Sequence, residues 1–277
     1  MLETIDWDQR WYASVRPDLS CLPALSRLPA VPLHEAFNAA ASAQELHNAA
    51  GQPIRFVPQE ALPAGQAYEQ FIGATGCVPT RANLHDFFNA LVWLSFPRIK
   101  RQLNALQAAQ IAAAGVGKSR GPARDAATIY DENSALLVVA DSAAGHALAA
   151  ALRQHHWREA FIERKTQFGF DVELWLFGHA LMEKLVAPRK AITAHTRVIV
   201  ADSAYFLLPR PQRQAWLDAH EAAALSAHTL STAAFTPLPV LGVPGWWPGQ
   251  DDDFYADASV FRPRRDTPLL PTKDRHA

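Results

Sequence analysis

Three polar side chains interrupt the apolar stretch 84–94 and could carry proton chemistry: His85, Asp86 and Asn89. Imidazole exchanges a proton near neutral pH, and a neighbouring carboxylate can fix the orientation of its ring. His85 and Asn89 are four residues apart, so a helix places both on one face, which Trp93 continues. We interpret His85 as a general base or metal ligand, Asp86 as its orienting partner and Asn89 as a substrate-binding residue. The structural alternative is a capping Asp86, an exposed His85 and an Asn89 bonded to a neighbouring backbone.

Arg120, Arg124 and Asp125 form a second polar group, beside Gly121 and Pro122. The planar guanidinium group binds anions through paired hydrogen bonds, so the two arginines predict a site for a phosphate or carboxylate group. Asp125 could orient an arginine or His85, or serve as a base or metal ligand itself. The alternative is an Arg–Asp pair at the surface, which contributes little to stability.

His179 and Glu183 are also four residues apart, in a stretch that we expect to be helical. This spacing can hold one metal ion or form a histidine–carboxylate pair, but it supplies only two ligands. The alternative is a hydrogen-bonded histidine in the core. By contrast, Asp131 and Glu132 are typical of a turn, where acidic and amide side chains bond to the local backbone.

The sequence does not identify a cofactor. It contains no His-Glu-x-x-His motif, no cysteine pair at zinc spacing and no Gly-x-Ser-x-Gly elbow. Residues 115–119 resemble the end of a phosphate-binding loop, but Ala112 stands where that motif needs glycine. The polar groups above are compatible with a divalent metal, and the sequence does not identify one.

Composition excludes several classes of protein. The chain has 277 residues, with 26 basic and 27 acidic side chains and a net charge of -1. Such a balance lacks the positive charge that binding to nucleic-acid phosphates requires. With 49% hydrophobic and 19% charged residues, the chain is not typical of disorder. Two cysteines cannot form a disulfide framework, which indicates a reducing compartment.

Neither the N-terminus nor the segment 222–250 predicts membrane insertion. The N-terminus carries acidic residues and no apolar core, unlike a signal peptide. The uncharged segment 222–250 is interrupted by Pro237, Pro239, Pro244 and Pro248, which a membrane-spanning helix would not tolerate. We therefore expect no membrane span and a cytoplasmic location.

Apolar periodicity and turn residues predict an α+β fold: a helix-rich single domain, 1–277, around a small and mostly antiparallel sheet. It comprises an irregular N-terminal arm (1–31), a core of helices and strands (32–228) and an extended C-terminal wrap rich in proline and aromatic residues (229–277). We expect helices at 32–51, 66–72, 83–96, 98–114, 142–161, 171–186 and 212–225. The expected strands are 54–57, 197–200 and a hairpin of 127–130 with 135–139, joined by the turn 131–134.

Several of these stretches together resemble a bacterial family described only as a domain of unknown function, number three thousand and twenty-five. The matching residues are 85–97, with Lys100 and Asn104 beyond, and then 120–128, 131–133, 177–185 and 260–263. The resemblance covers about residues 80 to 263 and implies an intact member of that family. It implies no particular reaction.

The residues support two hypotheses. The first is a hydrolase-type enzyme for a small anionic substrate, in which His85, Asp86, Asp125 and His179 are catalytic and Asn89, Arg120 and Arg124 bind the substrate. The second is a protein-binding or scaffold domain without catalysis, whose polar residues form a buried structural network and whose partner surface lies along the C-terminal wrap.

Overall fold

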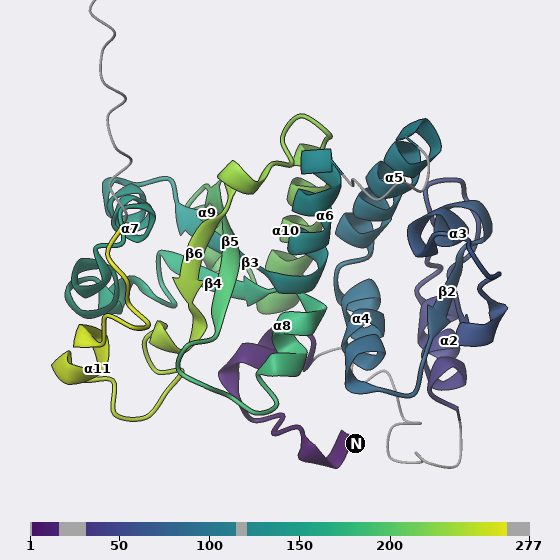
Figure 1. The fold of residues 1–277 in the computed structure, drawn as a ribbon. Coiled ribbons are helices and arrows are strands. Elements are labelled where there is room, and N and C mark those ends of the chain that lie inside the picture. The colour runs from purple at the N-terminus through teal and green to yellow at the C-terminus, as the bar shows by residue number, and fades with distance from the viewer. Residues whose placement is uncertain (1, 17–31, 115–120, 265–277) are drawn as a thin grey trace, which may run out of the picture.

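The computed structural model describes residues 2–16, 32–114 and 121–264, and Figure 1 shows their arrangement. The helices are α2 (Leu33–Ala43), α3 (Tyr68–Thr75), α4 (Leu84–Ser95), α5 (Pro97–Ala114), α6 (Gly121–Asn133), α7 (Ala143–Arg153), α8 (His179–Lys184), α9 (Ala204–Leu207), α10 (Arg210–Ala224) and α11 (Asp252–Ala256). The strands are β1 (Arg55–Pro58), β2 (Cys77–Thr80), β3 (Ser134–Ala140), β4 (Val172–Leu176), β5 (Thr193–Ala201) and β6 (Thr236–Pro239). The fold is α+β, as predicted.

A four-stranded sheet in the order β4-β3-β5-β6 forms the centre of the larger part of the molecule. β3 pairs antiparallel with β4 and parallel with β5, and β5 pairs antiparallel with β6. All seven residues of β3 are buried, as expected for an inner strand with both faces covered. Two of the three strand pairings in this sheet are antiparallel, in agreement with the predicted sheet.

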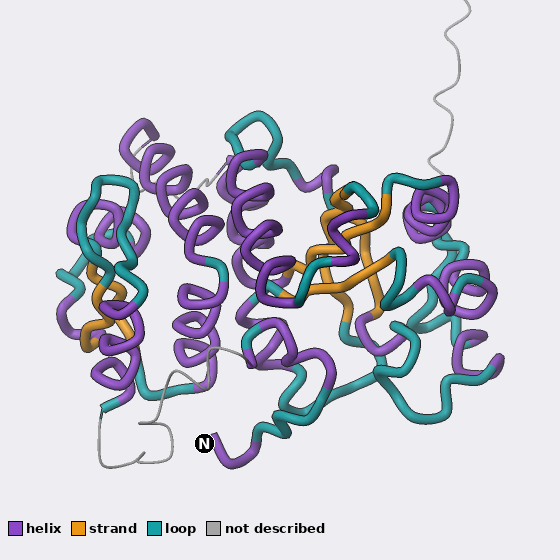
Figure 2. The backbone as a smooth tube through the Cα atoms, turned by 180° about the vertical axis from the view of Figure 1, so that it is seen from behind, coloured by secondary structure: helices purple, strands orange, loops and turns teal. Residues whose placement is uncertain are grey.

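Helices cover both faces of this sheet. α6 packs against β3 and β5, while α7 packs against β3 and β6. Seen from either side, α6, α8 and α10 lie between the sheet and the pair formed by α4 and α5 (Figures 1 and 2). The helices that carry the predicted chemistry therefore meet in the middle of the molecule.

A smaller unit lies on the far side of α4 and α5. β1 and β2 form a parallel pair, α2 packs on β1, and α3 packs on α5. Two predictions here were wrong. The helix beginning at residue 33 ends at Ala43 rather than at residue 51, and Gly51 occupies a turn with φ +78°. β2 was not predicted, because its four residues include Pro79 and carry a weak strand pattern.

The two consecutive helices α4 and α5 confirm the predicted start and break. Asn83 caps α4, because its side chain accepts a hydrogen bond of 2.8 Å from the backbone N–H of Asp86. Phe96 leaves the helical conformation, with φ -136° and ψ 58°, before Pro97 begins α5. The first turn of α5 is capped from α10 by Asp218, whose carboxylate accepts from the N–H groups of Arg98 and Ile99.

The predicted hairpin was wrong in its first strand. Residues 127–130 belong to α6, where Ala126, Ala127 and Tyr130 share the buried helical face. Their neighbours Thr128 and Ile129 favour a strand by intrinsic preference, but tertiary packing decides the conformation. β3 then follows Asn133 directly, so no turn occupies 131–134.

The expected helix 171–186 is in fact β4 followed by the short helix α8. β4 is apolar except for Glu173 and is mostly buried, and so short a run has no periodicity that separates strand from helix. The expected helix 142–161 is also shorter, since α7 ends at Arg153 and a separate π-helical turn covers Glu159–Glu163.

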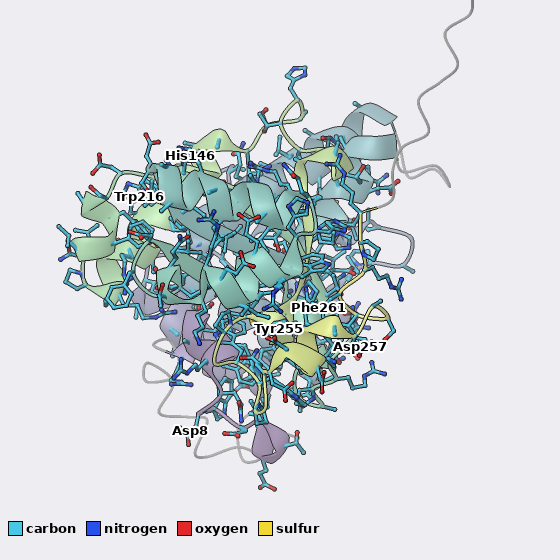
Figure 3. The ribbon with its side chains drawn as sticks, turned by 90° about the vertical axis from the view of Figure 1, so that its left-hand side faces the viewer. Asp8, His146, Trp216, Tyr255, Asp257 and Phe261 are labelled. Atoms are coloured by element: carbon cyan, nitrogen blue, oxygen red, sulfur yellow. The ribbon has the colours of Figure 1, made fainter. Side chains whose placement is uncertain are left out.

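The C-terminal segment packs onto the sheet through β6 and then through aromatic side chains. Tyr255 and Phe261, labelled in Figure 3, have ring centroids 5.2 Å apart, and both contact Phe161. β6 carries Pro237 and Pro239, which face His195 and Thr193 of β5 in the register. Among the described residues, no helix is both long and apolar enough to cross a membrane.

Candidate functional site

His85 and Asp86 form a hydrogen-bonded pair in the first turn of α4. Nδ1 of His85 lies 3.1 Å from Oδ1 of Asp86, and 37% of the His85 side chain is exposed against 6% for Asp86. The bond to Asp86 raises the pKa of His85 above its usual value, although partial burial opposes the shift. The pair therefore favours the protonated form of this imidazole and fixes one of its ring nitrogens.

Arg81 holds Asp86 from the opposite side. Its backbone N–H and its Nε atom donate to Oδ2 of Asp86 over 2.7 and 2.9 Å. Burial raises the pKa of this carboxyl, but the hydrogen bonds from His85 and Arg81 outweigh burial and hold the pKa at about 2. Asp86 is consequently a carboxylate at neutral pH, and its orientation is set by groups on both sides.

A buried lysine links three helices next to this pair. Nζ of Lys100 donates to Oδ1 of Asn89 over 2.8 Å and to Oδ1 of Asp131 over 2.6 Å. Its ammonium group also lies 5.3 Å from the ring centroid of Trp93. Asn89 in turn donates to the hydroxyl of Tyr68 over 3.1 Å. Helices α4, α5 and α6 are thus joined by one charged network, with α3 at its end.

His179, the first residue of α8, lies between Asp131 and His85. Its Nδ1 atom is 3.8 Å from Oδ2 of Asp131, too far for a hydrogen bond. The rings of His179 and His85 meet edge to face, with centroids 4.5 Å apart. Burial lowers the pKa of His179 to about 4, even though Asp131 opposes the shift. His179 is therefore neutral at pH 7, next to a histidine that readily becomes charged.

Gly178 allows His179 to approach α6 this closely. A Cβ atom on Gly178 would lie 2.5 Å from both the carbonyl oxygen of Glu132 and the backbone nitrogen of Ser134. Such contacts are too short for any side chain, so the end of β4 meets the junction of α6 and β3 only with glycine here. The same junction carries Asp131.

Glu69 of α3 closes the far end of the network. Nδ2 of Asn104 donates to Oε2 of Glu69 over 2.7 Å and to the Glu69 carbonyl over 2.9 Å. Burial raises the pKa of Glu69, and the charge of Asp131 adds to the shift. We refer to the whole set of residues as the polar cluster: Tyr68, Glu69, Arg81, His85, Asp86, Asn89, Lys100, Asn104, Asp131 and His179.

Some buried polar atoms in and around the polar cluster have no hydrogen-bond partner among the described residues: Trp93 Nε1, Asn104 Oδ1 and His179 Nδ1. Unpaired buried polar groups destabilise a protein, and they are uncommon in cores that serve structure alone. These atoms provide donors and an acceptor that a polar molecule could use.

Four of the seven predicted site residues meet in this cluster: His85, Asp86, Asn89 and His179. Arg124 and Asp125 lie on α6 six to seven residues before Asp131, about 9–10 Å along the helix axis. No hydrogen bond or ion pair joins either side chain to a described residue of the cluster, and Asp125 is exposed. Arg120 lies outside the described residues. Glu183 lies one turn after His179, and its negative charge raises the pKa of His85 further.

Sequence reasoning missed Lys100, Asp131 and Tyr68 as site residues. Asp131 was assigned to a turn, whereas it is buried in the last turn of α6. A pattern was available for Lys100, because Lys100, Asn104 and Gln107 are spaced at i, i+4 and i+7 and all three are buried. A polar stripe on a buried helix face indicates partners on the facing helices.

The cluster is suited to moving protons. A half-exposed histidine with a raised pKa adjoins a neutral buried histidine and carboxylates of different pKa, an arrangement typical of acid–base sites. Among the residues that the structure describes, no group of three or more His, Cys, Asp or Glu side chains is placed to hold a metal ion.

Comparison with known proteins gives one match. No curated protein and no solved structure is significantly similar to the chain. The model of a family described as "Protein of unknown function (DUF3025)" matches residues 54–265, which include every residue of the polar cluster. Since the match covers well over half of the sequence, the chain belongs to the DUF3025 family.

Proposed function

We propose that this protein is a hydrolase-type enzyme that acts on a small anionic substrate, with His85 as its general base. The observation that carries the proposal is the bond between the buried carboxylate of Asp86 and Nδ1 of the half-exposed His85. A carboxylate in this position fixes the ring and stabilises the imidazolium that forms when the histidine takes a proton. Nε2 of His85 is then left to accept a proton from water or from a substrate hydroxyl.

The neighbouring residues supply the other requirements of such a site. His179 stays neutral because of its burial, so it can share or relay a proton without adding a positive charge beside His85. Asn89 is buried and is held by Lys100 and Tyr68, and its role in substrate binding remains part of the proposal. Arg81 is an exposed cation that contacts the catalytic pair through Asp86.

The roles of Arg120 and Arg124 in holding the anionic group, and of Asp125 as a second orienting carboxylate, remain part of the proposal. They require the N-terminal part of α6 to contribute to the same site as His85. The cytoplasm remains the compartment we expect for this reaction.

A panel of chromogenic carboxylic esters, phosphate monoesters and anilides would test the proposal with the full chain. His85→Gln should lower turnover of any hydrolysed substrate by about 100-fold or more, the usual contribution of a general base. His146→Gln is a matched control, because His146 also contacts a carboxylate but both side chains are exposed. Its Nε2 atom lies 2.7 Å from Oδ1 of Asp141. Equal activity of the two variants, or no hydrolysis of any substrate by the parent, would contradict the proposal.

The second candidate function is a binding or scaffold domain in which the polar cluster only fixes helix packing. The buried pair of Lys100 and Asp131 favours this alternative, since it joins α5 to α6 and needs no substrate. The two candidates differ in the stability of variants at His85. A structural network should lose several kcal/mol of unfolding free energy when a member is truncated, whereas a catalytic residue is near neutral to remove. If His85→Gln loses several kcal/mol of unfolding free energy, the result would favour the scaffold function.

A further inference from the structure

A cavity of about 300 Å³ lies against the outer edge of β4, and its lining contains no residue of the polar cluster. Its walls come from four separate stretches of the sequence, which lie at residues 8–16, 168–174, 210 and 243–246. The N-terminal segment, on which Figure 3 labels Asp8, contributes Arg10 and Arg16, and β4 contributes Glu173 and Leu174. Cavities of this size accommodate small molecules.

The strand register explains why this edge has free backbone groups. Glu173 and Trp175 are hydrogen-bonded to β3, because Asp171 and Phe177, which share their parity, bond to Ala140 and Ser134. The intervening residues of β4 therefore turn their N–H and C=O groups outward.

Two of these outward residues have partners outside the sheet. The N–H of Leu176 donates to Oγ of Ser14, and the carbonyl of Val172 accepts from Gly169. Between them, Leu174 turns its backbone groups to the same outer edge, and Leu174 lines the cavity. An edge strand thus adds a backbone donor and acceptor to this wall.

Positive charge exceeds negative charge around the cavity, because Arg10, Arg16 and Arg210 line it together with two acidic residues, Asp8 and Glu173. Glu173 is already bound by two arginines, at 3.0 Å from Nη1 of Arg210 and 3.2 Å from Nη1 of Arg213. Neither Arg10 nor Arg16 forms an ion pair with any residue that the structure describes, and the guanidinium group of Arg16 is positioned by a hydrogen bond of 2.9 Å from Nη2 to the carbonyl of Gln9. Burial lowers the pKa of Arg210, Glu173 opposes this shift, and the charges of Arg213 and Arg16 add to it. An anion bound here would relieve this repulsion.

The rim also favours close contact with a guanidinium group. Nη1 of Arg10 would lie 3.1 Å from a Cβ atom on Gly245, whose φ is +77°, so the absence of a side chain lets Arg10 lie against the chain there. Apolar and aromatic side chains, Phe168, Val243 and Trp246, complete the walls. The combination of charged and apolar walls suits a molecule with one anionic group on a small apolar body.

We propose that this cavity is a binding site for a small anion, a carboxylate or phosphate monoester attached to an apolar or aromatic group, held mainly by Arg10 and Arg16. The site is separate from the proposed catalytic centre, so binding of an anion here does not require His85.

Isothermal titration calorimetry of the full chain in a chloride buffer tests the site, with benzoate, phenyl phosphate and uncharged benzyl alcohol as probes. We expect at least one of the two anions to bind and benzyl alcohol to bind far more weakly. Benzoate binding alone identifies a carboxylate site, and phenyl phosphate binding alone identifies a phosphate site. Binding should weaken as salt is added, because exposed charges are screened.

The double variant Arg10→Gln/Arg16→Gln should weaken anion binding by about ten-fold or more, since it removes both guanidinium groups. Arg101→Gln/Arg153→Gln is the matched control, because it removes two exposed arginines elsewhere and leaves the same net charge. Circular dichroism checks that both proteins fold, and the two single variants, each several-fold weaker, replace the first double variant if it does not.

His85→Gln should bind the anion as the parent does, which separates this site from the catalytic proposal. The site is rejected if no anion binds to the parent, if benzyl alcohol binds equally well, or if both double variants lose binding to the same extent.

Discussion

Nδ1 of His85 and Oδ1 of Asp86 lie 3.1 Å apart, although the two residues are adjacent in the sequence and differ widely in exposure. Adjacent residues on a helix normally point in different directions. The pair forms because it occupies the first turn, where Asp86 folds back toward Arg81 and His85 follows it. The N-terminal turn of α4 therefore serves both as a capped helix start and as the proposed catalytic centre.

Asp86→Asn should lower the pKa of His85, because the bond to the Asp86 carboxylate is the largest cause of its raised value. Titration of the His85 imidazole by NMR would measure the change in both proteins. His146 provides the internal reference, since its partner Asp141 is unaltered. An unchanged His85 pKa in the variant would show that the pair does not form in solution.

His179 should make the protein less stable in acid. Its pKa is about 4 in the folded chain against about 6.5 when unfolded, so the unfolded chain binds more protons between these values. Its contribution is complete above pH 6.5 and is lost as the pH falls toward 4, by about 3 kcal/mol in total. Urea unfolding of the parent and of His179→Gln from pH 7.5 to pH 4 measures the difference. The two stability curves should converge in acid, and parallel curves would contradict the prediction.

Lys100 and Asp131 should depend on each other strongly. Lys100→Met leaves a buried carboxylate without its cation, and Asp131→Asn leaves a buried ammonium, so each should cost about 3–5 kcal/mol of unfolding free energy. The double variant should lose clearly less than the sum, because neither charge then remains unpaired. Chemical denaturation of all four proteins gives the coupling energy, and additive losses would refute a buried pair.

Gly178→Ala should destabilise the protein by more than Gly169→Ala. At Gly178 a methyl group would lie 2.5 Å from the backbone of Glu132 and of Ser134, so β4 and α8 must move away from α6. Gly169 has φ +92° with no atom near its Cβ position, so alanine there costs only about 1–2 kcal/mol of backbone strain. Thermal unfolding compares the two proteins. The NMR titration of His179 provides a second measurement, since its pKa should rise toward 6.5 if the residue becomes more exposed.

Local sequence patterns predicted the elements and residues that depend on near neighbours. The cap at Asn83, the break at Pro97 and the shared face of His85 and Asn89 all follow from spacing within one or two turns. The contacts of Lys100 with Asp131, and of His179 with His85, join elements 31 and 94 residues apart respectively. No local pattern specifies contacts between residues so far apart in the sequence, so these contacts could be identified only from the folded structure.

Two wrong element assignments explain why the site was incomplete. With residues 127–139 taken as a hairpin, Asp131 belonged to its polar turn, although it is buried in the last turn of α6. With 171–186 taken as one helix, His179 lay in the middle of that helix, whereas it begins α8 beside Asp131. Gly178, the residue that permits this approach, was predicted only as part of that helix.

The two prolines of β6 have a consequence for how molecules of this protein meet. Leu238 and Val240 share one parity of the strand, and Val240 donates to the carbonyl of Ile192. Pro237 and Pro239 hold the alternate positions, where an N–H group would point away from the sheet. Because proline has no N–H, this border offers carbonyl acceptors without donors, and a strand from a second molecule cannot complete a ladder against it. The sheet therefore ends at β6 through its own sequence, which protects the protein from edge-to-edge aggregation at that border.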